Sequence, residues 1–433
     1  MITTQIGRVF LDAYNKRFGM DMDARTFIVE KYFPLFFDSP KYMLWVSNSP
    51  FVQMKKGQKV ETLTVQERRE KLEDLIRKVE KEGACDASVA IGYPASEEKT
   101  FATTSGQVTS ITLKYKPEDV YLSWIGASLG ACVQGGYIIL FNHPGILLDI
   151  YSGWEHYRHA LNDNLPMRGN QVQTWNAQWL THLYSDRYNS AMPMAGFDSY
   201  ATKNGQMEVV TQSWIRLMFA ISQAYPNLSI LGYVWAFSQT NTTIGFIPCV
   251  LGEFRSMKDW YRRIFGDQEW RKAEVLYQTD FGFAAACQMG FLGLKVLEPK
   301  GLKEYMDKGK LPKLDGQEEV IITFHIYLIW LIAMLNNEEL WEKSQEFAKE
   351  LLAYAESSSR GKTGKSNKVN KVLASTSKKD FIAGLGKIAS DADGAEKIEE
   401  MAKTVHLLPL DLVSYFLVLM RFQYAVINNI KNK

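Results

Sequence analysis

Cysteine is scarce and scattered along the chain. Its 433 residues include four cysteines, at positions 85, 132, 249 and 287, and none forms a CxxC pair with another. Zinc ribbons and redox dithiols are therefore not expected. Isolated cysteines in a chain of this length are typical of reduced, buried thiols, and the first residues lack the basic region and apolar core of a signal peptide. We therefore expect a cytoplasmic protein.

Neither charge is in excess. The chain has 50 Lys and Arg against 48 Asp and Glu, which gives a net charge of +2. Its composition, 46% hydrophobic, is ordinary for a globular protein. Because the whole-chain charge predicts no partner, an electrostatic signal has to come from local clusters.

No apolar run is both long enough and free enough of polar residues to predict a membrane span. Residues 120–141 are uncharged, but serine, glutamine and two adjacent glycines interrupt them. Residues 320–335 are apolar but contain Thr323 and His325 and fall short of the ~20 residues that a span needs. We expect both segments to be buried core, and no membrane partner.

Helical and strand-like patterns alternate in the first 300 residues. Residues 6–14 repeat at helical spacing, and Thr64 with Glu67 forms a capping box before a charged helix. Asn204-Gly205 lies between two strand-like runs, as in a type I′ hairpin turn. A second hairpin is expected over residues 228–251. In its first strand Tyr233, Trp235 and Phe237 share one face.

From about residue 302 onward only helical patterns remain. We therefore predict an α+β protein. An irregular mixed α/β domain with antiparallel hairpins, residues 1–300, precedes a helical bundle, residues 301–433, with the boundary at Pro299-Lys300-Gly301. Within the bundle we expect a basic loop at residues 356–379.

Gly126-Ala-Ser128-Leu-Gly130 matches the GxSxG nucleophile elbow and follows a predicted strand at residues 120–125. In a serine hydrolase of α/β type, Ser128 would be the nucleophile. No HGGG-type oxyanion segment lies upstream, and small residues that pack a helix or a tight turn explain the match more simply. The Gly-Lys pairs at 361–362 and 364–365 lack the upstream glycine of a P-loop. We predict no catalytic residue, no metal site and no cofactor.

The predicted loop concentrates positive charge. Between positions 360 and 379 the chain has seven basic residues and no acidic one, and glycine, serine, threonine and asparagine fill most of the gaps. Lysines on a flexible loop suit phosphate contacts, because they gain from counterion release without precise geometry. The residues expected to bind phosphate are Arg360, Lys362, Lys365, Lys368 and Lys371. The alternative is a loop that its charge merely keeps soluble.

A second basic cluster lies on the helix predicted after Glu253. Arg255, Lys258 and Arg262 share one helical face, with aromatic residues between them that could stack on bases. We expect this face to bind nucleic acid. In the alternative, Asp259, Asp267 and Glu269 pair with the arginines while the aromatic rings pack inward.

Amide side chains are dense after Gly169. Asn170, Gln171 and Gln173, together with Asn204 at the hairpin tip, can donate to and accept from base edges. We expect these four residues to read a short sequence. Buried or capping roles for some of them are the alternative.

The layout of the chain resembles the large subunit of a type I CRISPR Cascade surveillance complex. The resemblance lies in residues 407–422, which run from Leu407-Leu-Pro409 to Arg421-Phe, in the long apolar helix before them, and in the amide-rich segment after Gly169. It implies an N-terminal domain that senses the protospacer-adjacent motif through loop amides and a lysine. It also implies a helical bundle that braces the displaced DNA strand, with the nuclease in a separate protein.

The partners implied are a double-stranded DNA target, a guide RNA complex and the other protein subunits of the effector complex. A scaffold that binds only protein, with the aromatic stripe Tyr233, Trp235 and Phe237 at an interface, is a further alternative.

Overall fold

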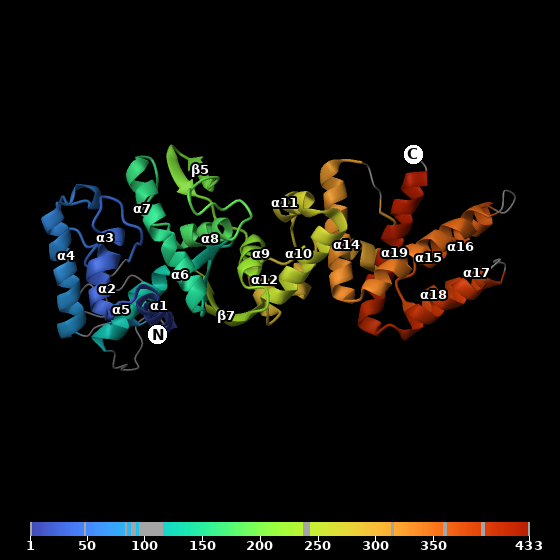
Figure 1. Cartoon of the computed structure of the whole chain (residues 1–433), viewed down its shortest axis with the longest axis horizontal. Coiled ribbons are helices and arrows are strands. Elements are labelled where there is room, and N and C mark those ends of the chain that lie inside the picture. Colours follow the sequence, from blue (N-terminus) through green and yellow to red (C-terminus); the bar gives the residue numbers. More distant parts are fainter. Residues whose placement is uncertain are drawn as a thin grey trace. The chain divides into compact units, whose positions relative to one another are not determined.

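The computed structural model describes residues 2–46, 49–82, 85–87, 92–94, 116–236, 243–312, 316–357, 362–390 and 395–431. It divides the chain into two compact units (Figure 1). The N-terminal unit contains Met1–Leu251 and Phe283–Phe291, and the C-terminal unit contains Gly252–Gly282 and Leu292–Lys433.

The expected α+β class is confirmed, since the named strands all lie in the N-terminal unit and the described elements of the C-terminal unit are helical. The division differs from the boundary expected at residues 299–301. Residues 252–282 join the C-terminal helices because they contain a helix that packs on the later bundle, and residues 283–291 return to the sheet of the N-terminal unit.

The N-terminal unit combines an antiparallel sheet with helices. Its helices are α1 (Ile2–Phe18), α2 (Ala24–Phe27), a π-helical segment (Ile28–Tyr32), α3 (Phe33–Phe36), a 3-10 turn (Val60–Thr62), α4 (Val65–Arg77), a π-helical segment (Lys78–Glu82), α5 (Pro117–Ser128), α6 (Pro144–Ser152), α7 (Trp154–Asp163), α8 (Val172–Leu183), α9 (Trp214–Ala224) and α12 (Phe283–Gln288). Strands β3 (Ala131–Val133), β4 (Tyr137–Phe141), β7 (Ser229–Ala236) and β8 (Thr243–Val250) form one sheet in that spatial order. Two further strand pairs are β1 (Cys85–Ala87) with β2 (Gly92–Pro94) and β5 (Tyr200–Lys203) with β6 (Gln206–Val209).

Both expected hairpins are present. In the first, Lys203 pairs with Gln206, and the φ angles of Asn204 (51°) and Gly205 (76°) are positive, as a type I′ turn requires. The second pairs β7 with β8. On β7 the exposed fractions of Tyr233 and Trp235 are 4% and 3%, so these rings belong to the core. The aromatic stripe is therefore not an exposed interface, and its third member, Phe237, lies outside the described residues.

The strand expected at residues 120–125 is wrong, because these residues lie inside helix α5. Pro117 occupies the first turn, and the Lys116 backbone N–H donates to Asp119 Oδ2 at 3.2 Å, so the local sequence starts a helix. Residues 120–128 are all buried. A helix that is covered all round has no polar face, and its periodicity is therefore invisible in the sequence.

Two glycines bring α1 and α5 into backbone contact. A Cβ atom on Gly126 would stand 1.9 Å from the Thr3 carbonyl oxygen, and one on Gly7 would stand 2.0 Å from the Leu122 oxygen. Neither helix could keep its place with a larger residue there. The packing role expected for the small residues around Gly126 is thus confirmed.

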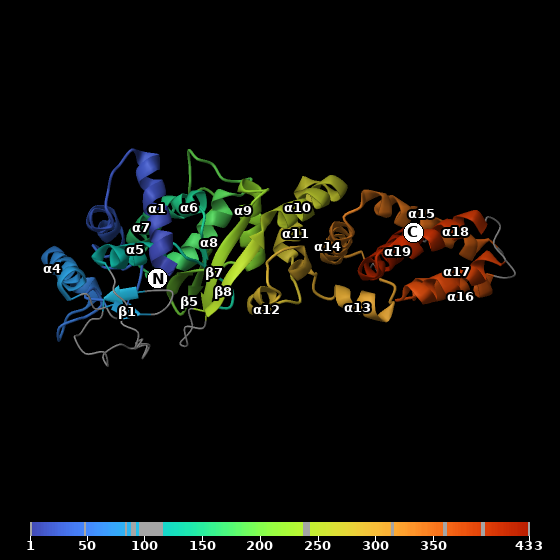
Figure 2. The ribbon, with the colours of Figure 1, turned by 90° about the horizontal axis from the view of Figure 1, so that it is seen from below.

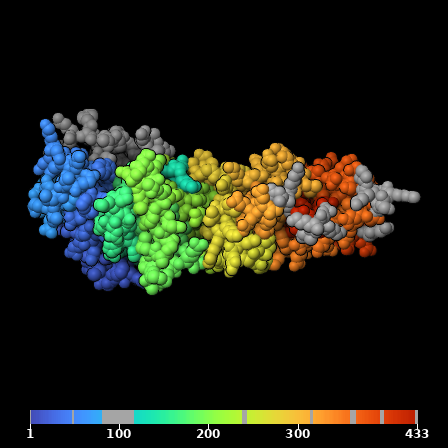
Figure 3. Space-filling view, turned by 90° about the horizontal axis from the view of Figure 1, so that it is seen from above, coloured from blue at the N-terminus to red at the C-terminus, as the bar shows by residue number. Residues whose placement is uncertain are grey.

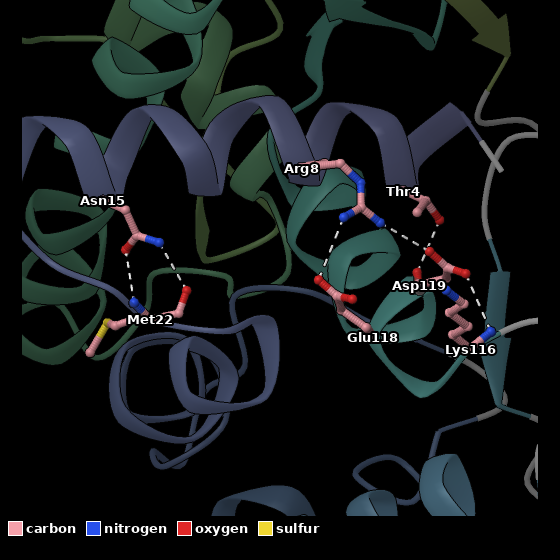
Figure 4. A network of polar contacts seen from close by, with 7 residues as sticks. All are labelled: Thr4, Arg8, Asn15, Met22, Lys116, Glu118 and Asp119. Carbon is pink, nitrogen blue, oxygen red and sulfur yellow. Dashed lines mark hydrogen bonds and ion pairs between the residues drawn. The ribbon is translucent and has the colours of Figure 1, made fainter.

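Polar contacts orient the same helix pair (Figure 4). Arg8 of α1 forms ion pairs with Glu118 (3.5 Å) and Asp119 (3.2 Å) in the first turn of α5. The Thr4 hydroxyl donates to the Asp119 carbonyl oxygen at 2.9 Å. The first turn of α5 is therefore fixed against α1.

The C-terminal unit is a helical bundle (Figure 2). Its elements are α10 (Leu251–Phe265), α11 (Asp267–Leu276), a 3-10 turn (Leu294–Leu297), α13 (Leu302–Lys308), α14 (Glu318–Leu335), α15 (Glu338–Glu356), α16 (Lys362–Leu373), α17 (Lys378–Ala389), α18 (Ala395–Leu407) and α19 (Leu410–Lys431). Helix α19 packs on α14, α15 and α16. Helix α16 also packs on α15, α17 on α16, and α18 on α17.

The basic loop expected at residues 356–379 contains helix α16 instead. Val369, Val372 and Leu373 are buried at helical spacing and fix α16 to its neighbours. Glycine, serine and asparagine have low helix propensity, so the local sequence favoured a loop and tertiary packing overrode it.

Two helices of this unit, α14 and residues 410–429 of α19, are long and apolar enough to cross a membrane by length and composition alone. In each of them 56% of the residues in that window are buried inside the protein. Polar side chains of both helices are also bonded within the bundle, since His325 of α14 lies 3.1 Å from Glu269. This is the burial pattern of core helices.

Arg421 of α19 is the polar centre of the bundle. Its guanidinium group is fully buried and donates to the carbonyl oxygens of Leu373 (2.6 Å), Tyr305 (2.6 Å) and Ser375 (3.1 Å). Burial lowers the pKa of Arg421 to about 10. One side chain thus connects α13 and the end of α16 to α19.

Replacing Arg421 by methionine keeps an unbranched side chain but leaves three buried carbonyl groups unpaired. We expect Arg421→Met to lower the free energy of unfolding of the C-terminal unit by about 3 kcal/mol or more. Calorimetry measures the effect. The control is Arg263→Met, which removes an exposed arginine that pairs with Glu338. Equal melting temperatures for the two variants would contradict the role of Arg421.

Candidate nucleic-acid interface

The basic face predicted on α10 does not exist as an exposed surface. Arg255 Nε lies 2.9 Å from Asp259 Oδ2, and Arg262 Nε lies 2.8 Å from Asp267 Oδ1. Lys258 is 1% exposed, and its Nζ lies 5.9 Å from the centroid of the Trp270 ring. Burial contradicts the expectation of nucleic-acid binding for Lys258, whereas for the partly exposed Arg255 and Arg262 it stays a prediction.

The alternative, in which carboxylates neutralise the arginines, is confirmed for Asp259 and Asp267. Glu269 pairs with His325 rather than with an arginine. Tyr261 is buried, and Trp260 is covered by Arg263, whose guanidinium carbon lies 4.1 Å from the centroid of the indole ring. Tyr261 and Trp260 are therefore occupied by contacts within the unit.

Two of the amides expected to read bases hold the backbone of the N-terminal unit instead. Gln173 is buried, and its Nε2 donates to the Ala127 carbonyl oxygen at 3.1 Å. Gln171 Oε1 accepts from the Val209 backbone N–H at 3.0 Å. Burial contradicts the base-reading prediction for Gln173, for which the buried role that was the alternative holds, whereas for the half-buried Gln171 the prediction stays a prediction.

Asn170 and Asn204 are exposed, and the structure brings their segments together. The Met207 N–H of β6 donates to the Pro166 carbonyl oxygen at 2.9 Å, and the Arg168 N–H donates to the Met207 oxygen at 2.8 Å. Residues 166–168 therefore run along the β6 edge of the β5–β6 hairpin. Green residues near position 200 are visible at the surface of the N-terminal unit in Figure 3.

Lys41 holds the start of this loop. Its Nζ donates to the carbonyl oxygens of Leu161, Asn164 (2.7 Å) and Leu165 (2.9 Å), so it caps the end of α7. Desolvation lowers the pKa of Lys41. The start of the loop is thus positioned by its backbone.

We call this region the hairpin surface. It consists of five exposed polar residues, Arg168, Asn170, Lys203, Asn204 and Gln206. Arg168 is balanced by Glu208 at 3.0 Å, whereas no carboxylate pairs with Lys203 among the described residues. Asn170 and Asn204 both have positive φ angles, 61° and 51°, which asparagine and glycine tolerate best. Sequence reasoning missed Lys203, Gln206 and Arg168 as neighbours because only the pairing of residues 166–168 with β6 brings them together.

The lysines of α16 differ in their contacts. Lys365 Nζ donates to the Ser357 hydroxyl at 2.8 Å and lies over the Tyr354 ring, while Lys368 Nζ donates to the Lys387 carbonyl oxygen at 2.9 Å. Lys371 is exposed. Arg360 lies outside the described residues, and of Lys362 only the backbone is described.

Charge is strongly segregated among the helices of this bundle. Helices α16 and α17 together contain seven lysines and one acidic residue, Asp380, whereas α15 contains six glutamates and two lysines. In Figure 2, α16 and α17 lie side by side on one side of the bundle. Lys368 bonds to the Lys387 carbonyl oxygen and Gly384 lies against Val372, so the two helices run antiparallel.

We call this region the lysine face. Its members are Lys365, Lys368, Lys371, Lys379 and Lys387. Lys371, Lys379 and Lys387 are exposed and form no ion pair in the described part of the chain. Lys378, by contrast, donates to the carbonyl oxygens of His406 and Leu408 at the end of α18. The sequence placed the positive charge near position 365, but Lys387 could be added only once α17 was known to pack on α16.

The GxSxG match does not form a nucleophile elbow. Ser128 lies at the end of α5, is fully buried, and donates its hydroxyl to the carbonyl oxygens of Ile125 (2.7 Å) and Trp124 (3.2 Å). A nucleophile needs a sharp strand-to-helix turn and an accessible Oγ atom. The serine hydrolase reading at Ser128 is therefore wrong. Within the described ranges no group of three or more His, Cys, Asp or Glu residues could hold a metal ion.

No similarity to a known protein adds to these observations. Comparisons of the chain with protein-family models, with curated proteins and with solved structures found no match. The function has to be argued from exposure, charge and hydrogen bonding.

Lys258 and Lys371 differ in burial, and substitutions separate their roles. We expect Lys258→Ala to lower the free energy of unfolding by about 2–4 kcal/mol, because it removes a long buried side chain and leaves a cavity. Lys371→Ala removes an exposed side chain and should leave the melting temperature unchanged. Thermal denaturation monitored by circular dichroism tests both variants, and a stable Lys258→Ala protein would overturn the buried role.

Proposed function

We propose that this protein is a non-catalytic, nucleic-acid-binding large subunit of a CRISPR-type antiviral effector complex in the cytoplasm. Its N-terminal unit senses a short motif in double-stranded DNA, and its helical bundle holds the displaced strand. The other subunits and the guide RNA complex are its partners.

The observation that carries the proposal is the lysine face. Exposed lysines without carboxylate partners attract polyanions, because each phosphate contact releases condensed counterions. Elsewhere in the same unit, lysines such as Lys272, Lys308 and Lys397 are paired with glutamates. The lysine face is thus distinguished by Lys371, Lys379 and Lys387, which are exposed and form no ion pair in the described part of the chain, rather than by the number of its lysines.

The hairpin surface supports the part of the proposal that concerns sequence reading. It places two asparagine amides and an unpaired lysine on a loop and a hairpin of the N-terminal unit. Amides read base edges, and a lysine beside them adds a phosphate contact. An α+β unit followed by a helical bundle, with residues 416–422 of the apolar segment 407–422 buried in that bundle, is also the layout on which the resemblance to Cascade large subunits was based.

Removing the three exposed lysines tests the lysine face. We expect the triple variant Lys371→Gln, Lys379→Gln and Lys387→Gln to bind DNA at least tenfold more weakly at moderate salt. The slope of log affinity against log salt should also become shallower by about 2–3, since each duplex phosphate contact contributes about 0.9. Fluorescence anisotropy with a labelled duplex and a labelled single strand measures both quantities.

The chain offers a matched control for this variant. The triple substitution Lys272→Gln, Lys308→Gln and Lys397→Gln removes the same charge from exposed lysines that pair with glutamates. Its affinity and salt slope should stay close to those of the unchanged protein. Equal losses in the two triple variants would mean that binding follows net charge and not this surface.

Glycine substitutions test the two asparagines without straining the backbone. Asn170→Gly and Asn204→Gly remove the amides at positive φ angles that glycine adopts freely. We expect the double variant to lose about tenfold or more in discrimination between duplexes that differ in a short motif. Selection from a library with a randomised flanking motif measures this, with the protein assembled in its complex.

Asn336→Gly is the control for the glycine pair, because Asn336 also has a positive φ angle, 46°, but caps the end of α14. It should leave the selected motif unchanged. A double variant that selects the same motif as the unchanged protein would remove Asn170 and Asn204 from sequence reading.

A further inference from the structure

The C-terminal unit contains a cavity that the proposed function does not use. It has a volume of about 420 Å³ and lies among residues of α10, α14, α15 and α19. Cavities that hold small ligands span roughly 300–1,000 Å³ and are mostly apolar with a few polar groups. This cavity has that size and that kind of lining.

Aromatic rings form part of the wall. Phe265 and His325 stack on each other with centroids 3.7 Å apart and planes 7° from parallel, and both line the cavity. The half-buried indole of Trp341 lines it from α15. Flat aromatic walls favour a flat ligand, because stacked rings gain about 0.5–1.5 kcal/mol beyond their buried area.

Three amide side chains, those of Gln345, Gln423 and Asn429, line the same cavity. Gln423 is only 4% exposed, and its Nε2 atom has no hydrogen-bond partner among the described residues. An unpaired buried polar group costs about 1–3 kcal/mol. Such a group beside a cavity offers a bound molecule a hydrogen-bond donor, which the molecule would reach by a turn of the Gln423 side chain, because the Nε2 atom is itself closed to solvent.

The chemistry of the lining narrows the ligand. Its described residues include no Lys, Arg, Asp or Glu, so it does not suit a phosphate, a carboxylate or a cation. A purely aliphatic chain would leave the Gln423 amide unpaired. A neutral, planar ring with donors and acceptors on its edge satisfies both the aromatic wall and the amides.

We propose that this cavity binds the heterocyclic ring of a nucleobase, with Gln423 hydrogen-bonded to its edge. The ring could come from a free nucleoside or from an unpaired base of a strand, and only the second source rests on the proposed function.

Binding to the full-length protein tests the proposal. Saturation-transfer NMR and calorimetric titration are carried out with adenosine, guanosine, cytidine and thymidine, and with short single-stranded oligonucleotides of mixed sequence. We expect saturable binding of at least one of these probes. Gln423→Leu should weaken it at least tenfold, and Val426→Trp, which fills the cavity, should abolish it. Asn370→Leu, at an exposed position of α16, should change nothing.

Thermal stability separates a ligand-binding role of Gln423 from a structural one. Because Gln423→Leu replaces an unpaired amide by an apolar group of similar size, it should not lower the melting temperature. This variant keeps the test valid even if Val426→Trp fails to fold.

The titrations with nucleosides and with oligonucleotides also separate this inference from the proposed function. Nucleoside binding that survives in the lysine-face triple variant supports the cavity as an independent site, even if DNA binding fails. Binding of oligonucleotides alone, lost in Gln423→Leu, supports a base from a strand. No binding of any probe, or binding that Gln423→Leu leaves unchanged, overturns the proposal.

Discussion

Buried backbone carbonyl groups have to be paired, and in this protein long polar side chains pair many of them. Arg421 donates to three carbonyl oxygens in the C-terminal unit. In the N-terminal unit Arg158 donates to the carbonyl oxygens of Leu35 and Lys41, and Asn176 donates to those of Ser128 and Gly130. These bonds hold loops and helix ends that the apolar core does not cover. The packing of both units depends on them.

The same constraint separates structural polar residues from residues that are free to bind a partner. Side chains that pair carbonyl groups or carboxylates, such as Gln173 and Arg262, are held in contacts within the protein. In the described part of the chain, exposed polar groups that form no such contact remain on the hairpin surface and on the lysine face. The glutamates of α15 and the lysines of α16 and α17 are strongly segregated, so positive charge is concentrated on two neighbouring helices although the whole chain is almost neutral.

The sequence predicted the features that depend on neighbouring residues. The α+β class, the Asn204-Gly205 turn and the Thr64–Glu67 capping box all follow from local patterns, and the structure contains them. Residues 120–125 of helix α5 were predicted as a strand because this helix is buried on all sides, so its sequence shows no polar face. Helix α16 was predicted as a loop because its stability comes from Val369 and Val372 rather than from propensity.

Site residues were harder to predict for a related reason. Burial of a long polar side chain is decided by elements far away in the sequence, so Lys258 and Lys371 looked alike in the sequence, but the first is buried and the second is exposed.

The central claim is that the lysine face binds DNA, and its most direct measurement is lysine acetylation footprinting by mass spectrometry, with and without DNA. The account predicts that DNA protects Lys371, Lys379 and Lys387 and leaves Lys272, Lys308 and Lys397 unchanged. Equal reactivity of the first three lysines with and without DNA would contradict it.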